Sequence, residues 1–122
     1  MIRVLLVDDE RLVLSALRRT LMRADMDVLT AGDGAEGLAV LEKETVDLVV
    51  SDYKMPGMNG IEFLKQVSSR WPAVRRCMLT AQADPETTED ALATGILHKA
   101  MRKPWDNFEL IEALKALAAG SE

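Results

Sequence analysis

Short apolar runs alternate with helical patterns along the whole chain, and this alternation constrains the fold more than any other feature. Apolar runs occupy residues 4–7, 27–31, 46–52, 74–81 and 96–103. Between and after them, apolar residues recur at three- and four-residue spacing, which predicts helices near 11–24, 34–43, 60–70, 84–93 and 106–119. Strands that alternate with helices in this way form a parallel sheet with helices on both faces.

The composition of the runs also predicts where each strand lies in the sheet. Residues 4–7 and 46–50 are dominated by apolar side chains, as expected for central parallel strands. Residues 27–31 form a short run, and 96–103 carries His98, Lys99 and Arg102, so both suit the edges. We therefore expect a flavodoxin-like (βα)5 doubly wound fold, an α/β fold with a five-stranded parallel sheet in the order 2-1-3-4-5.

The totals indicate one domain and exclude several classes of protein. A chain of 122 residues with 48% hydrophobic residues has enough apolar side chains for one core. We assign residues 1–119 to the domain and 120–122 to a tail or the start of a linker. The net charge of −5 argues against direct binding of nucleic acid. No apolar stretch is long enough for a bilayer and the acidic start is unlike a signal peptide, so we expect no membrane contact and a cytoplasmic location.

Carboxylates follow the two strands that should lie at the centre of the sheet. Asp8 and Asp9 end the first run, and Asp52 ends the third. In the order 2-1-3-4-5 these strands are neighbours at the switch point, where ligands bind in such sheets. The three acids should therefore meet in one pocket. Clustered oxygen ligands with room for water favour Mg²⁺ among divalent cations.

Two further strand ends add groups that suit phosphoryl transfer. Thr80 ends the fourth run, and Lys103 ends the fifth, just before Pro104. Phosphoryl transfer needs positioning and neutralisation of charge on the transferred oxygens. A carboxylate beside a metal can act as the nucleophile and become an acyl phosphate. We expect Asp52 in that role, with Lys103 pairing with the phosphoryl group and Thr80 donating its hydroxyl.

The motifs LLVDDE, SDYKMPGMNG, LTA and KPW, in this order and spacing, resemble the receiver domain of two-component response regulators. The resemblance implies that a sensor histidine kinase or phosphotransfer protein phosphorylates Asp52. It implies that Asp8 and Asp9 hold Mg²⁺, that the Lys54 backbone carbonyl is a third protein ligand, and that the Lys103–Pro104 bond is cis. An output domain or partner protein would read a changed face made by the fourth helix, fifth strand and fifth helix, and phosphorylation could lead to a homodimer.

The chain departs from the receiver pattern three residues before Lys103. Receivers usually carry an aromatic residue there, which moves inward with the threonine on activation, whereas this chain has Ala100. The threonine half of the switch is present and the aromatic half is not. Lys54 and Gln82 stand at the two positions that tune phosphoryl lifetime in the family.

Other interpretations of the same residues stay open. A degenerate receiver could serve as an interaction module, with an intact pocket and an uncoupled output. A phosphatase that forms an aspartyl phosphate would carry a second Asp where Lys54 stands, and a nucleotide or flavin binder would carry a glycine-rich fingerprint where Asp8 and Asp9 stand. We expect His98 to be a surface residue of the edge strand, Cys77 a small core residue, and the arginines of residues 11–23 a solvated face.

Overall fold

The computed structural model describes residues 1–81 and 84–120, and in them strands and helices alternate as predicted. In chain order the elements are β1 (Arg3–Val7), α1 (Arg11–Arg23), β2 (Asp27–Ala31), α2 (Gly34–Lys43), β3 (Leu48–Ser51), α3 (Gly60–Arg70), β4 (Arg75–Thr80), α4 (Pro85–Ala93), β5 (Lys99–Arg102) and α5 (Asn107–Ala118). All neighbouring strands pair in parallel, in the order β2-β1-β3-β4-β5, so the predicted fold class is confirmed.

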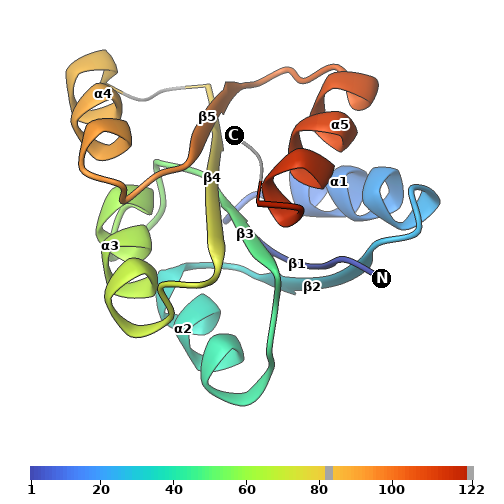
Figure 1. Cartoon of the computed structure of the whole chain (residues 1–122), viewed down its shortest axis with the longest axis horizontal. Coiled ribbons are helices and arrows are strands. Elements are labelled where there is room, and N and C mark those ends of the chain that lie inside the picture. The colour runs from blue at the N-terminus through green and yellow to red at the C-terminus, as the bar shows by residue number, and fades with distance from the viewer. Residues whose placement is uncertain (82–83, 121–122) are drawn as a thin grey trace.

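The helices form a layer on each side of the sheet. Helices α1 and α5 cover one face, and α2, α3 and α4 cover the other (Figure 1). Two apolar clusters follow from this arrangement. One joins α1 and α5 to the sheet through Leu17, Leu21, Leu110 and Leu114, and the other centres on Phe63 and Leu64 of α3. The sheet is thus buried on both faces, as its apolar strands require.

Burial along the strands confirms which of them are central. All four residues of β3 are buried, whereas the edge strand β5 is exposed at Lys99 and Arg102 and only partly buried between them. The predicted run 96–103 forms a shorter strand, because the residues before Lys99 are bonded differently. Leu97 N–H donates to the carbonyl of Ala91 at the end of α4.

Side-chain caps mark the start of α2, α3, α4 and α5. Asn59 and Glu62 form a reciprocal capping box at the start of α3. Asp84 accepts a hydrogen bond from Thr87 N–H, and Asp106 accepts one from Glu109 N–H, as their positions in the sequence predict. The caps of α3 and α5 hold the loops that follow β3 and β5, and both loops border the site described below.

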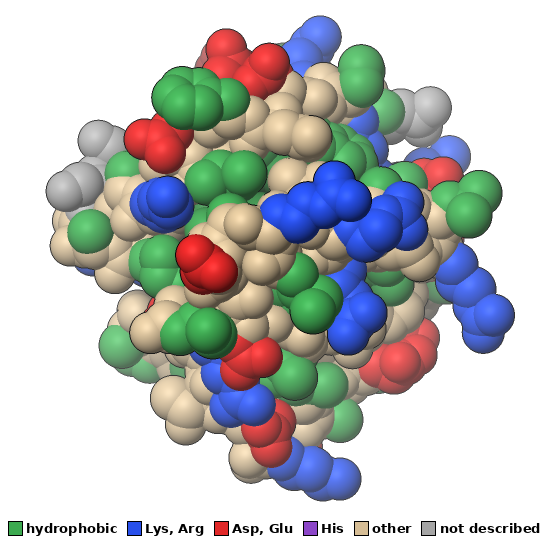
Figure 2. Space-filling model, turned by 90° about the vertical axis from the view of Figure 1, so that its right-hand side faces the viewer, with side chains coloured by type: hydrophobic (Ala, Val, Ile, Leu, Met, Phe, Trp, Pro, Cys, Tyr) green, Lys and Arg blue, Asp and Glu red, His purple; other side chains and the backbone are tan. Residues whose placement is uncertain are grey.

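The surface is charged unevenly. Helix α1 carries four arginines and no acidic residue, although the whole chain has a net charge of −5. Figure 2 faces the side that α1 and α5 cover and shows several Lys and Arg side chains gathered near its centre. Within residues 1–81 and 84–120, no helix has the length and apolarity that crossing a bilayer requires.

Candidate functional site

The register of the sheet brings the carboxyl ends of β1, β3, β4 and β5 to the same end of the sheet. Val7 of β1 pairs with Ser51 of β3, so the residues that follow them, Asp8 and Asp52, lie side by side. Thr80 of β4 pairs with Arg102 of β5, so Lys103 follows at the same end of the sheet. Parallel strands that end in register therefore place Asp8, Asp52, Thr80 and Lys103 around one site, although 95 positions separate Asp8 from Lys103.

A buried ion-pair network links three of these residues. The Lys103 ammonium donates to Asp8 Oδ2 at 2.7 Å and to Asp52 Oδ2 at 3.2 Å. The side chain of Lys103 is only 12% exposed, and the two carboxylate side chains are 4% and 8% exposed. Charges this well shielded from water interact far more strongly than surface pairs, so the lysine holds the two acids together.

The charges around Lys103 alter its proton affinity. Burial on its own lowers the pKa of the ammonium group. The hydrogen bond to Asp8 and the negative charge of Asp52 outweigh burial, and together they hold the pKa of Lys103 above its ordinary value. Lys103 is therefore a permanent cation at neutral pH, placed where it can pair with an anionic group bound to Asp52.

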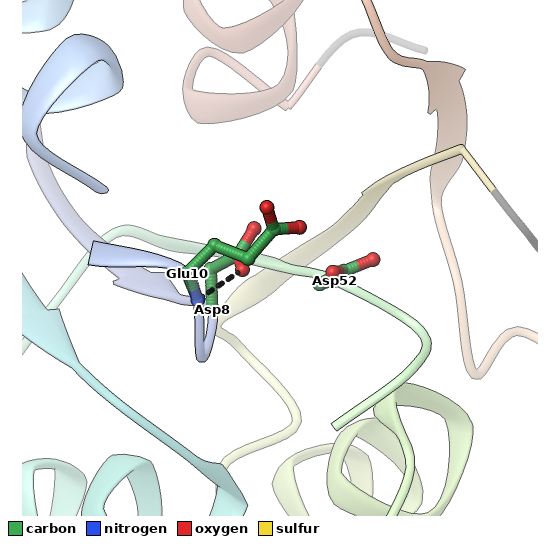
Figure 3. A group of neighbouring side chains, drawn as sticks. All are labelled: Asp8, Glu10 and Asp52. Carbon is green, nitrogen blue, oxygen red and sulfur yellow. Dashed lines mark hydrogen bonds between the residues drawn. The ribbon is translucent and has the colours of Figure 1, made fainter. Parts of the chain in front are cut away.

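A third carboxylate, that of Glu10, joins Asp8 and Asp52 in an acidic cluster, and the sequence analysis did not name it. Oxygens of Asp8, Glu10 and Asp52 all lie within 4.8 Å of one another. Figure 3 shows Asp8 and Glu10 rising together from the loop after β1, with Asp52 across from them after β3. Asp8 Oδ1 accepts a hydrogen bond from Glu10 N–H at 2.9 Å, which orients both residues. Asp9 is exposed and lies on the wall of the cavity outside this cluster.

The donor set of this cluster fits a hard divalent cation. The carboxylates of Asp8, Glu10 and Asp52 offer oxygen atoms only, and one lysine cannot neutralise three negative charges. The site opens into a cavity of about 550 Å³, whose lining residues are Asp9, Glu10, Asp52, Lys54, Met55, Pro56, Thr80, Ala81 and Lys103. An ion could therefore keep several of its waters, as Mg²⁺ usually does.

The turn after β3 presents Asp52 to this cavity. Asp52 Oδ1 accepts a hydrogen bond from Tyr53 N–H at 2.7 Å, and Asp52 N–H donates to the carbonyl of Val7. The chain then folds back, because Gly60 N–H donates to the carbonyl of Tyr53 at 2.7 Å. Gly60 leaves no room for a side chain, since a Cβ there would overlap the carbonyl oxygen of Asp52. Lys54 lies on the cavity wall, consistent with its predicted place beside the metal.

The remaining predicted residues fall in and around the same region. Thr80 is buried at 7% exposure and lines the same cavity as Asp52. The Lys103–Pro104 bond is cis, as the resemblance implies. Ala100 is partly buried on β5 beside Met78 of β4. Gln82 lies outside the described residues.

One buried cluster was not expected, and it corrects the prediction for His98. His98 is half-buried, and its Nδ1 accepts a hydrogen bond from Arg76 N–H at 2.9 Å, so it is not a surface residue. Arg76 is 4% exposed, and its guanidinium donates to the carbonyls of Pro72, Val74, Gly95 and Ile96. Burial and the nearby charge of Arg75 lower the pKa of Arg76. The cluster lies at the opposite end of β4 from Thr80 and ties the α3–β4 and α4–β5 connections together.

Comparisons with known proteins agree on one family. Residues 4–115 match the family described as response regulator receiver domain. The chain is 36% identical over 112 residues to the hydrogenase transcriptional regulatory protein HoxA of Cupriavidus necator, covering 92% of this chain and 23% of HoxA. It is 35% identical over 120 residues to the alkaline phosphatase synthesis transcriptional regulatory protein PhoP of Bacillus subtilis, covering 98% of this chain and 50% of PhoP. The chain thus spans about a quarter to a half of the length of these relatives.

Solved structures give the same result. A CheY-like response regulator receiver domain protein from Methanospirillum hungatei superposes with a TM-score of 0.93 at 29% identity, covering 98% of this chain and 95% of that one. The response regulator TrrA from Thermotoga maritima, solved in complex with Mg²⁺ and BeF, superposes with a TM-score of 0.85 at 28% identity. That alignment covers 96% of this chain and 99% of TrrA.

Proposed function

This chain belongs to the response regulator receiver domain family, and on that premise we propose that it is the phosphoacceptor switch of a two-component phosphorelay, with Asp52 as the residue that is phosphorylated. The observation that carries the proposal is the Asp8–Lys103–Asp52 network, with ammonium–carboxylate distances of 2.7 and 3.2 Å at the mouth of the sheet. Receiver domains are signalling domains rather than conventional enzymes, so the chemistry required is one transfer to a carboxylate.

The residues around Asp52 have separate parts in this transfer. Asp52 Oδ1 is held by Tyr53 N–H, so Oδ2, which now contacts Lys103, is the oxygen we assign as the nucleophile. As the new O–P bond forms and the bond from phosphorus to the donor's leaving group breaks, charge on the phosphoryl oxygens needs a cation. Lys103 is within reach and can exchange its contact with Asp52 for one with the phosphoryl group. Thr80, which lines the same cavity, can donate its hydroxyl to another phosphoryl oxygen.

Receiver domains bind Mg²⁺ at an acidic pocket, and we propose that the Asp8, Glu10 and Asp52 carboxylates, Asp9 and the Lys54 carbonyl are the groups available to hold it here. The ion would neutralise charge on the attacking carboxylate and on the transferred phosphoryl group. Asp8 is the fixed member of this set, because it is buried and its Oδ1 is occupied by Glu10 N–H. Glu10, at 65% side-chain exposure, is the member most able to move.

The partners follow from the family. We propose that a sensor histidine kinase or a phosphotransfer protein supplies the phosphoryl group. The phosphorylated domain would then present a changed face, made by α4, β5 and α5, to an output domain or another protein, with homodimer formation as one result. The assignment of residues 1–119 to the domain and of 120–122 to a linker stays a prediction.

An uncoupled receiver is the second candidate, and Ala100 is the observation that favours it. Ala100 offers only a methyl group where receivers usually carry the aromatic side chain that moves with the threonine. Backbone NMR of the protein with and without Mg²⁺ and beryllofluoride separates the candidates. Chemical-shift changes that stop at the pocket indicate an uncoupled receiver, whereas changes that extend along α4 and β5 indicate a switch.

Intact-mass spectrometry after incubation with acetyl phosphate and Mg²⁺ tests the proposal. We expect the wild-type protein to gain one phosphoryl group and Asp52→Asn to gain none. Asp90→Asn is the matched control, because Asp90 is an exposed acid on α4, and it should behave like the wild type. Failure of the wild type to gain mass from acetyl phosphate and from phosphoramidate would overturn the proposed function.

A further inference from the structure

Helix α1 presents a basic face to solvent. It carries four arginines and no acidic residue, and all four are exposed: Arg11, Arg18, Arg19 and Arg23. Their spacing places them on the side of the helix that faces away from the buried Leu17 and Leu21. Figure 2, which faces the side that α1 and α5 cover, shows Lys and Arg side chains gathered there. Among residues 1–81 and 84–120, none of the four arginines forms an ion pair.

Helix α4 presents an acidic face. It carries three acidic residues and no basic one, and all three are exposed: Glu86, Glu89 and Asp90. Spacings of three and four residues place them on one side of the helix, away from the buried Ala91. In the described part of the chain these acids form no ion pair either. The protein therefore presents two helical faces of opposite charge that are open to a partner.

The two faces cannot meet within one molecule. Helix α1 lies against one face of the sheet, and α4 lies against the other (Figure 1). Contact between them therefore requires two copies of the protein, with α1 of one copy against α4 of the next. Because such a contact joins two different surfaces, each pair still has one free α1 face and one free α4 face, and further copies can add.

The charges on the two helices match in spacing. Arg19 and Arg23 lie about one turn apart on α1, and Glu86 and Glu89 lie about one turn apart on α4. Each turn advances about 5.4 Å on either helix, so two helices laid side by side bring an arginine opposite a carboxylate at successive turns. An arginine can pair with a carboxylate through two parallel hydrogen bonds, which a lysine cannot do. The α4 face therefore has the charge and the spacing that the α1 face fits.

Exposed apolar side chains accompany the charges on both helices. Leu12 and Met22 of α1 are 86% and 49% exposed, and Leu92 of α4 is 40% exposed. Contact between the two helices would remove part of this apolar surface from water, which favours association. Protein interfaces ordinarily combine apolar contacts with a polar rim, and these two faces supply both.

We propose that the protein binds further copies of itself head to tail, through the arginine face of α1 on one copy and the acidic face of α4 on the next. This contact does not depend on phosphorylation of Asp52. Helix α1 is about 20 Å long and α4 about 14 Å, so the contact is small. It buries less than the roughly 1,200 Å² at which stable complexes begin, and the association is therefore weak and transient.

Analytical ultracentrifugation of the unphosphorylated protein tests the self-association. Each copy has a net charge of −5, so copies repel one another at long range. At about 0.1 M salt this repulsion is screened beyond about 10 Å while charges in contact still attract, and at about 1 M salt the screening length falls to about 3 Å. We expect the weight-average mass to rise with protein concentration in the first buffer and to stay near that of one copy in the second. The mass of one copy in both buffers overturns the proposal and leaves the arginines to another anionic partner, and an equal rise in both overturns the pairing of charges.

Charge reversal locates the contact. Arg18→Glu with Arg19→Glu makes the α1 face acidic, and Glu86→Lys with Glu89→Lys makes the α4 face basic. In either double variant alone, like charges face each other, and we expect its association to weaken at least about tenfold. In an equal mixture of the two variants, unlike charges face each other again at every contact between different variants. We therefore expect the mixture to recover the mass increase of the wild type.

Lys43→Glu with Lys65→Glu is the matched control. It changes the net charge by the same amount as the α1 variant, at exposed positions of α2 and α3, and it should associate like the wild type. Circular dichroism shows whether each variant folds, and the salt and concentration dependence of the wild type needs no variant. Undiminished association of either folded double variant, or a mixture that stays at the mass of one copy, places the contact elsewhere and overturns the assignment.

Discussion

Replacing Lys103 by methionine removes the cation that pairs with two buried carboxylates. Lys103 contacts Asp8 at 2.7 Å and Asp52 at 3.2 Å, with 12% of its side chain exposed. Loss of one partner from a fully buried ion pair costs about 3–5 kcal/mol of unfolding free energy. The site opens into a cavity of about 550 Å³, where water screens part of the remaining repulsion, so we expect a loss of about 2–3 kcal/mol without divalent cations.

Magnesium should restore part of this stability. In the variant, the carboxylates of Asp8, Glu10 and Asp52 have no cation among them, so a divalent ion should bind more tightly than in the wild type. At about 10 mM Mg²⁺ the difference in unfolding free energy between the two proteins should shrink by about 1 kcal/mol or more, by preferential binding to the folded state.

The raised pKa of Lys103 determines how the difference in unfolding free energy between the wild type and Lys103→Met depends on pH. A cation with a raised pKa in the folded state stabilises the fold fully at pH values below its unfolded pKa of about 10.4. That stabilisation is lost as the pH rises through the raised value. The difference between wild type and Lys103→Met should therefore be constant from neutral pH to about pH 9 and disappear only in strong alkali.

Urea denaturation monitored by circular dichroism measures these differences, with and without Mg²⁺. Lys65→Met makes the same chemical change at an exposed position of α3 and should alter the unfolding free energy by less than about 0.5 kcal/mol. A Lys103→Met protein as stable as the wild type in EDTA, or a deficit that Mg²⁺ leaves unchanged, would show that the ion-pair network does not hold the acids together.

Four further substitutions test the structure around the site and in the core. Gly60→Ala should lower the free energy of unfolding, measured by urea denaturation, by about 2–3 kcal/mol and should reduce phosphorylation of Asp52, because the new Cβ meets backbone atoms. Gly57→Ala, at a φ of 80° with open space around it, should lower the free energy of unfolding by about 1–2 kcal/mol and leave phosphorylation intact. Equal effects of the two would refute the crowding at Gly60. Asn59→Ala removes the cap of α3 and should cost about 1 kcal/mol, and an unchanged midpoint would argue against the capping box. Burial raises the pKa of Cys77 to about 12, so at alkaline pH the folded protein keeps a thiol proton that the unfolded chain releases. Between pH 7 and 10 the free energy of unfolding of the wild type should therefore fall by about 1.4–2 kcal/mol more than that of Cys77→Ala. Equal falls in the two proteins would contradict this.

The fold and the position of the site could be predicted because both depend on patterns along the chain. Apolar runs that end in Asp8 and Asp52 identify central parallel strands, and the switch point of the sheet then brings the two acids together. Lys103 could be placed in the same way, as the residue that ends the edge strand. These inferences need only the order of the strands and the direction in which they run.

The details that could not be predicted depend on the orientation of individual side chains. The sequence shows Asp8, Asp9 and Glu10 as three consecutive acids, and no periodicity in a loop says which of them face the cavity. The structure turns Asp8 and Glu10 toward Asp52, because Asp8 accepts the hydrogen bond of Glu10 N–H. The glutamate was therefore missed, and the only available signal was its place directly after the aspartate pair.

The buried pair of Arg76 and His98 was missed for a similar reason. An arginine within an apolar run ordinarily indicates that its side chain is exposed at the edge of the sheet. It can be buried only where several backbone carbonyls converge on its guanidinium. Here four carbonyls from the connections before β4 and after α4 do so, and that convergence exists only in the folded chain. Because Arg76 lies at the opposite end of β4 from Thr80, this omission did not affect the predicted site.

Mapping the phosphorylated residue tests the central claim most directly. The protein is incubated with acetyl phosphate, with Mg²⁺ or with EDTA, and the acyl phosphate is then reduced by borohydride, which converts the modified aspartate to homoserine that peptide mass spectrometry can locate. We predict homoserine at position 52 in the Mg²⁺ sample and none in EDTA. Homoserine at position 8 or 9, or equal modification of Asp52 in both samples, would contradict the account.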